Sequence, residues 1–157
     1  MRIPDRIAIH IQHLISWLKD DSCYAFNFIC GSWDESDQFL EWQLAVDVIY
    51  LLMSGGVLHS PPSLTVQQDF DGYGFELSAS YPFDFHGPSF GTWLCHDLYL
   101  TDAAMKLASN YDIDSADDSA ALCVPFMDDL EGFMASNGAR WGDMPLIPVS
   151  DSLGRSN

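Results

Sequence analysis

The chain has 157 residues, of which 48% are hydrophobic and 13% aromatic, and its formal net charge is −17. Disordered acidic segments are poor in such residues, so we expect one folded domain over residues 1–150 and a loose tail over residues 151–157. A surface this negative repels nucleic acid and anionic lipid and attracts basic proteins.

The first two predicted elements are a helix over residues 5–20 and a strand over residues 23–30. The helix is amphipathic, because its apolar side chains recur at helical spacing at Ile7, Ile11, Leu14 and Leu18. In the following segment aromatic side chains alternate with smaller ones, which is typical of a short strand. Gly31 ends that pattern.

The clearest element is a long helix that ends at Ser54. Ser32 and Glu35 fit a capping box at its start, and Gly55 or Gly56 stops it in the left-handed conformation. Most of its surface is apolar, which predicts a position in the core. The side expected to face water carries Ser36, Gln43, Asp47, Tyr50 and Ser54.

The middle of the chain predicts a hairpin followed by a loop. Residues 64–68 and 73–80 are expected as strands, because apolar and polar residues alternate in the second, and Asp71-Gly72 between them favours a tight turn. Residues 81–91 contain Pro, Gly and aromatic residues and are expected to be irregular.

The last third predicts one more strand and two more helices. The strand covers residues 93–100, a helix capped by Thr101 or Asp102 runs to about residue 110, and a second helix covers residues 126–136 before Gly138. Residues 111–119 form an acidic loop between the two helices. The order of elements predicts an α+β fold, in which about four helices pack on a small, mostly antiparallel sheet.

The cysteines, the N-terminal residues and the apolar runs indicate the cellular compartment of the protein. Cys23, Cys30, Cys95 and Cys123 form no CxxC pair, the first twenty residues do not resemble a signal peptide, and the longest apolar run, residues 48–53, is far too short to span a bilayer. We therefore expect reduced thiols, a cytoplasmic protein and no contact with membranes.

The sequence contains no convincing metal-binding or catalytic motif. An EF-hand starting at Asp112 fails, because Asp117 stands where Gly is needed and Cys123 where Glu is needed. Cys95 and His96 are neighbours in a predicted strand, so they would point to opposite faces and could not share a zinc ion. We expect no metal, no cofactor and no catalysis, although a small enzyme remains the third alternative.

The distribution of charge is the strongest functional signal. Between Asp20 and Ala139 the chain has twenty acidic side chains and a single basic one, Lys106. The other cations lie near the two ends of the sequence, at Arg2, Arg6, Lys19, Arg140 and Arg155. Such a distribution favours a basic protein as partner, because opposite charge steers association.

The compact acidic chain resembles the bacterial immunity proteins of contact-dependent growth inhibition and polymorphic toxin systems. The resemblance lies in residues 5–56 and above all in the acidic-capped helix that ends in Ser54-Gly55-Gly56. It implies a cytoplasmic protein that binds one cognate toxin domain, most simply a basic nuclease, and has no catalysis of its own. The second alternative is a DNA mimic, encoded by a phage or a mobile element, that inhibits a nuclease.

Two groups of residues are candidates for the interface. The aromatic residues of the loop over residues 81–91 either cover the core or form an exposed patch flanked by acids. The predicted partner-binding carboxylates are those of Asp69, Asp71, Asp84, Asp112, Asp114, Asp117, Asp118, Asp128, Asp129 and Glu131. An exposed apolar helix face would also allow a homodimer.

Overall fold

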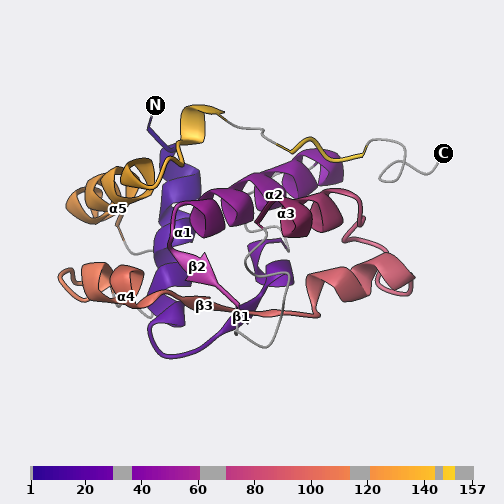
Figure 1. Cartoon of the computed structure of the whole chain (residues 1–157), viewed down its shortest axis with the longest axis horizontal. Helices are drawn as coiled ribbons and strands as arrows, with labels where there is room; N and C mark the ends of the chain where they lie inside the picture. Colours follow the sequence, from indigo (N-terminus) through magenta and orange to yellow (C-terminus); the bar gives the residue numbers. More distant parts are fainter. Residues whose placement is uncertain (1, 30–36, 61–69, 114–120, 144–146, 151–157) are drawn as a thin grey trace.

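The computed structural model describes residues 2–29, 37–60, 70–113, 121–143 and 147–150 (Figure 1). The strand expected over residues 64–68, the proposed capping box of Ser32 and Glu35, and the tail over residues 151–157 lie outside these ranges. The α+β class is confirmed, with helices around a three-stranded antiparallel sheet in the order β1-β3-β2.

Helix α2, Gln38–Ser54, is the central element of the core. Asp37 caps it, because its carboxylate accepts a hydrogen bond from the backbone N–H of Phe39 at 2.9 Å. Its buried side chains include Trp42, Ala45, Val46, Val48, Ile49, Leu51, Leu52 and Met53. The helix ends as expected, since Gly56 has a φ of +79°, in the left-handed region.

The sheet is small and its central strand is β3, Asp97–Leu100. Strand β1, Cys23–Tyr24, pairs with one edge of β3, and β2, Leu58–His59, pairs with the other. Helix α1, Asp5–Leu18, lies against β3, and α2 lies against β2. The predicted strands over residues 23–30 and 93–100 are too long. Ala25–Phe28 of the first forms the 3₁₀ helix η1, and the second overlaps at Trp93 with the 3₁₀ helix η3, Pro88–Trp93, which lies mostly in the segment expected to be irregular.

The predicted hairpin around Asp71-Gly72 is wrong, because Phe70–Ser78 forms helix α3. The strand pattern requires Phe75 to lie on the same side as Tyr73 and Leu77, but Phe75 is 61% exposed and the other two are buried. Helical spacing places Tyr73 and Leu77 together. The helix lies close to α2, since a Cβ on Gly74 would come within 3.1 Å of the Tyr50 ring and 2.4 Å of Ile147.

Helices α4, Asp102–Ala108, and α5, Val124–Ser136, confirm the predicted pair and pack against each other. Thr101 caps α4, as its hydroxyl oxygen accepts from the N–H of Ala104 at 3.2 Å. Helix α5 starts two residues earlier than expected. Pro125 lies in its first turn, where the backbone N–H that proline lacks would have no acceptor within the helix.

A short segment near the C-terminus is fastened to α2 by one side chain. The Gln43 amide nitrogen donates to the carbonyl of Ile147 at 3.1 Å, and its oxygen accepts from the N–H of Val149 at 2.8 Å. The same nitrogen donates to Asp47 at 3.0 Å. Asp47 was expected to face water, but the segment and α3 cover this side of α2, and the residue is only 7% exposed.

Candidate partner-binding surface

The aromatic loop after α3 divides into an inner and an outer half. In the inner half, the ring of Tyr81 lies 5.6 Å from Trp42 and 5.5 Å from Phe83, measured between centroids, so these rings extend the core. The Tyr81 hydroxyl donates to Gln38 at 2.7 Å. The inner aromatic residues therefore cover the core, whereas the outer half of the loop is exposed, so each of the two alternatives describes one part of the loop.

The outer half forms an aromatic patch, which we define as Phe26, Phe85 and Phe90. Their ring centroids lie 6.0, 5.0 and 5.1 Å apart, and all three pairs meet edge to face. This is a favourable arrangement for aromatic rings. Phe85 nevertheless remains 57% exposed. The patch thus presents a large apolar side chain to solvent on a base of two other rings.

Local backbone interactions hold each part of the patch. Phe26 lies in η1, whose start is fixed by the Asn27 side chain, which accepts from the N–H of Tyr24 at 2.8 Å. Phe90 lies in η3, where Pro88 occupies the first turn. The indole N–H of Trp93, buried at the end of η3, donates to the carbonyl of Ser80 at 2.6 Å. The rings are therefore positioned before any partner arrives, which lowers the entropic penalty of binding.

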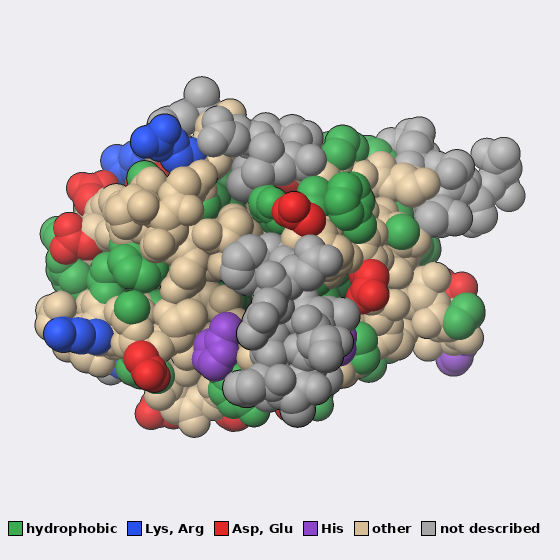
Figure 2. All heavy atoms as spheres, in the orientation of Figure 1, with side chains coloured by type: hydrophobic (Ala, Val, Ile, Leu, Met, Phe, Trp, Pro, Cys, Tyr) green, Lys and Arg blue, Asp and Glu red, His purple; other side chains and the backbone are tan. Residues whose placement is uncertain are grey.

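Asp84 supplies the carboxylate nearest to the patch in sequence. Its side chain lies over Gly87, where a Cβ would come within 2.3 Å of the carboxylate oxygen, so a larger residue at position 87 would displace the carboxylate. No Lys or Arg occurs between residues 20 and 105, the stretch that supplies β1, η1, α2, α3, η3 and β3. On the face shown in Figure 2, the blue Lys and Arg side chains lie only at the left end.

The predicted carboxylates do not form a single surface. Asp84 belongs to the loop of residues 81–93, toward one end of the long axis, whereas α4 and α5 lie at the other end (Figure 1). At that other end lie Asp112, Asp128, Asp129 and Glu131. Asp71 lies on α3 and accepts a hydrogen bond from the Tyr50 hydroxyl, which raises the pKa of Tyr50 to about 12. The remaining predicted acids, Asp69, Asp114, Asp117 and Asp118, lie outside the described residues.

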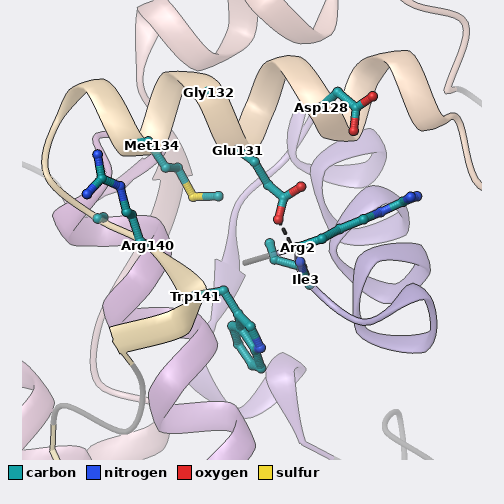
Figure 3. A pocket seen from close by; sticks show the side chains of 10 residues that line it. Arg2, Ile3, Asp128, Glu131, Gly132, Met134, Arg140 and Trp141 are labelled. Carbon is teal, nitrogen blue, oxygen red and sulfur yellow. Dashed lines mark hydrogen bonds between the residues drawn. The ribbon is translucent and has the colours of Figure 1, made fainter.

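The acids of α5 have basic or hydrogen-bonded neighbours. Glu131 accepts from the backbone N–H of Ile3 at 2.6 Å, as the dashed line in Figure 3 shows. Asp129 accepts from the Tyr111 hydroxyl. Asp128 lines a groove together with Arg2 and Arg140. The negative field at this end of the molecule is therefore partly compensated, whereas the stretch of chain that supplies the aromatic patch contains no Lys or Arg.

The thiols of Cys23 and Cys95 are held in the protonated form. Burial, with a contribution from Asp97, raises the pKa of Cys23 to about 12, and burial with Glu76 raises the pKa of Cys95. A nucleophilic cysteine needs the opposite shift. Cys23, Cys95 and Cys123 are free, and within the described residues no group of three His, Cys, Asp or Glu side chains could hold a metal ion.

Two buried polar atoms lie close to these thiols. The hydroxyl of Tyr73 and Nδ1 of His96 have no hydrogen-bond partner among the described residues, and their rings lie 5.5 Å apart. The sequence did not indicate that Tyr73 and His96 lie side by side, since Tyr73 was expected to lie in a strand. Unpaired buried polar atoms are uncommon, and a bound water is their usual partner.

No protein-family model, curated protein or solved structure matches the chain. The resemblance to immunity proteins therefore stays a prediction from the sequence. Within the described residues, none of the helices has both the length and the apolar composition required to cross a bilayer.

Proposed function

We propose that this chain binds a basic protein through the aromatic patch and thereby neutralises it, as an immunity protein neutralises a toxin domain. The observation that carries the proposal is an exposed phenylalanine, supported by two further rings, in a stretch of chain without any cation. We further propose that binding takes place in the cytoplasm, without catalysis, cofactor or metal, and that nucleic acid and membranes are not partners.

The two properties of this surface have separate effects on binding. Uncompensated carboxylates attract a cationic partner and can raise the association rate towards 10⁸–10⁹ M⁻¹s⁻¹. Burial of a large apolar side chain contributes about 1.5–3 kcal/mol, which slows dissociation. An acidic surface without an apolar anchor would bind many basic proteins weakly. The exposed ring of Phe85 favours one partner whose surface has a matching pocket.

The acids of α5 are the weaker candidate for this contact. Arg2, Arg140 and Lys106 line the same grooves as Asp128, so a cationic partner would meet both signs of charge there. The DNA-mimic alternative needs carboxylates spaced regularly along one elongated face. Because the described candidates fall at opposite ends of the molecule, immunity is the better supported of the two interpretations.

The experiment compares two phenylalanines of similar exposure. The chain is immobilised and exposed to a lysate of the organism that encodes it, and proteins that elute only at high salt are identified and purified. Titration calorimetry then compares the wild-type chain with Phe85→Ala and with the control Phe75→Ala. We expect the first variant to weaken binding by about tenfold or more, as expected of an interface anchor, and the control to have little effect.

The neutralising role has its own readout. The purified partner should lose its activity, for example cleavage of nucleic acid, when one equivalent of the chain is added. The proposal is wrong if no cationic protein is retained, or if the retained protein stays fully active in the complex. Equal loss of affinity in both phenylalanine variants would remove the aromatic patch from the interface.

A further inference from the structure

The outer face of α5 carries two shallow grooves that meet at one glycine. The first has a volume of ≈ 320 Å³ and lies between α5, the first residues of the chain and η4, Trp141–Asp143. The second has a volume of ≈ 500 Å³ and lies between α4 and α5. Asp128 and Gly132 line both grooves, and a Cβ on Gly132 would meet nothing within 4 Å. The grooves therefore join at a position of the helix that has no side chain.

Both signs of charge surround this junction. Arg2 and Arg140 line the first groove and lie on opposite sides of Glu131 in Figure 3. Lys106 lines the second groove with Asp128 and Asp129. In a molecule with a net charge of −17, two copies repel each other wherever carboxylates face carboxylates. This end has cations next to acids, so the repulsion between copies is reduced here.

Apolar surface is also available in the two grooves. The second groove is lined by Leu107, Tyr111 and Phe133, which are only partly buried, and the first by Trp141. These side chains pack against the core on one side and leave the other side exposed. A partner that covered them would gain hydrophobic stabilisation in addition to the charge pairs.

We infer that a second copy of this chain docks on the outer face of α5 and forms a two-fold symmetric dimer. A two-fold interface places one surface against itself, so that surface must contain groups that complement each other. The face of α5 meets this condition, because it contains cations, carboxylates and apolar side chains together. Gly132 allows the two helices to approach closely where they cross. The inference does not depend on the proposed binding of a basic protein, which uses the opposite end.

The test uses two glycines that have open space around them. Like Gly132, Gly91 would place a Cβ where nothing lies within 4 Å, but it lies in η3, far from α5 in sequence. Gly132→Gln should fill the junction of the grooves without disturbing the fold of one copy, and Gly91→Gln is the matched control. Sedimentation equilibrium of the full chain across the micromolar range measures the dissociation constant of the dimer.

We expect a dimer for the wild-type chain and for Gly91→Gln, and at least a tenfold weaker dimer for Gly132→Gln. A charge exchange gives a second test that leaves Gly132 in place. Asp128→Arg and Arg140→Asp should each weaken the dimer, and the double variant should regain part of the affinity. A wild-type chain that stays monomeric overturns the inference. So does a dimer that Gly132→Gln leaves intact, since the second copy would then dock elsewhere.

Discussion

Asp47 has an unusual position for a carboxylate, and this position makes stability depend on pH in an uncommon direction. It lies in the middle of α2, and its only hydrogen bond among the described residues comes from the Gln43 amide at 3.0 Å. Burial raises the pKa of Asp47 from 3.8 to about 7, and the bond from Gln43 opposes this rise only in part. The folded chain therefore holds a proton on Asp47 at a pH where the unfolded chain has lost it.

The sign and size of the effect follow from linkage. Because the folded pKa is higher than the unfolded pKa, the free energy of unfolding falls as the pH rises between these two values, and it levels off above the folded pKa. A shift of one pKa unit corresponds to about 1.4 kcal/mol. From pH 5 to pH 8 ionisation of Asp47 should lower the stability of the wild-type chain by about 3 kcal/mol.

Asp47→Asn isolates this contribution, because the amide can still accept from Gln43 but does not ionise. Urea unfolding of both proteins from pH 5 to pH 8 gives the difference in their free energies of unfolding. Repulsion among the other carboxylates affects both proteins and cancels in this difference. We expect the free energy of unfolding of Asp47→Asn, relative to that of the wild type, to increase by about 3 kcal/mol from pH 5 to pH 8. A difference that stays constant with pH would show that Asp47 ionises normally and would refute the reasoning.

Three substitutions test the packing. Gly74→Ala adds a Cβ that would come within 2.4 Å of Ile147 and 3.1 Å of the Tyr50 ring. After the helix-forming gain of alanine is subtracted, the free energy of unfolding in urea should still fall by up to about 2 kcal/mol, and a rise would contradict the close contact of α3 with α2. Gly132→Ala has open space in a helix and should raise the same free energy by up to about 1 kcal/mol, and a decrease would contradict the exposed position of this residue. Trp42→Phe removes the N–H that donates to the carbonyl of Leu77 at 2.9 Å and leaves a gap. It should lower the thermal midpoint and cost about 2–3 kcal/mol, and a loss below 1 kcal/mol would be evidence against this bond.

The helices with clear start and stop signals could be predicted from the sequence. The apolar spacing of α1, the threonine cap of α4 and the glycine that ends α2 act within a few residues of the chain, so they are visible without the fold. The presence of a small, mostly antiparallel sheet was also predicted. The length of β1 was not, because the Asn27 side chain accepts from the N–H of Tyr24 and favours a tight turn over extended backbone.

Helix α3 and Asp47 could not be predicted, because contacts distant in sequence determine both. The alternation over residues 73–80 is a good strand pattern in isolation. The helix is stabilised instead by packing of Gly74 against Tyr50 and by the bond from Trp42 to its last turn. The surroundings of Asp47 depend on the segment near Ile147, about a hundred residues away, which no local pattern reveals.

The candidate surface was predicted in part. The sequence named Asp84 and the aromatic residues of the loop over residues 81–91, and of these Phe85 is exposed and packs on Phe90. The contribution of Phe26 was missed, although its place in an aromatic-rich segment was a signal. The separation of Asp84 from the acids of α5 depends on the arrangement of the whole chain, and charge density along the sequence contains no such information.

Hydrogen exchange of the complex with the basic partner tests the central claim most directly, because it reports which backbone amides the partner covers. The account predicts slower exchange in residues 24–28 and 84–94, around the aromatic patch, with unchanged exchange in residues 124–136 of α5. Protection confined to α5, with none around Phe85, would contradict the account.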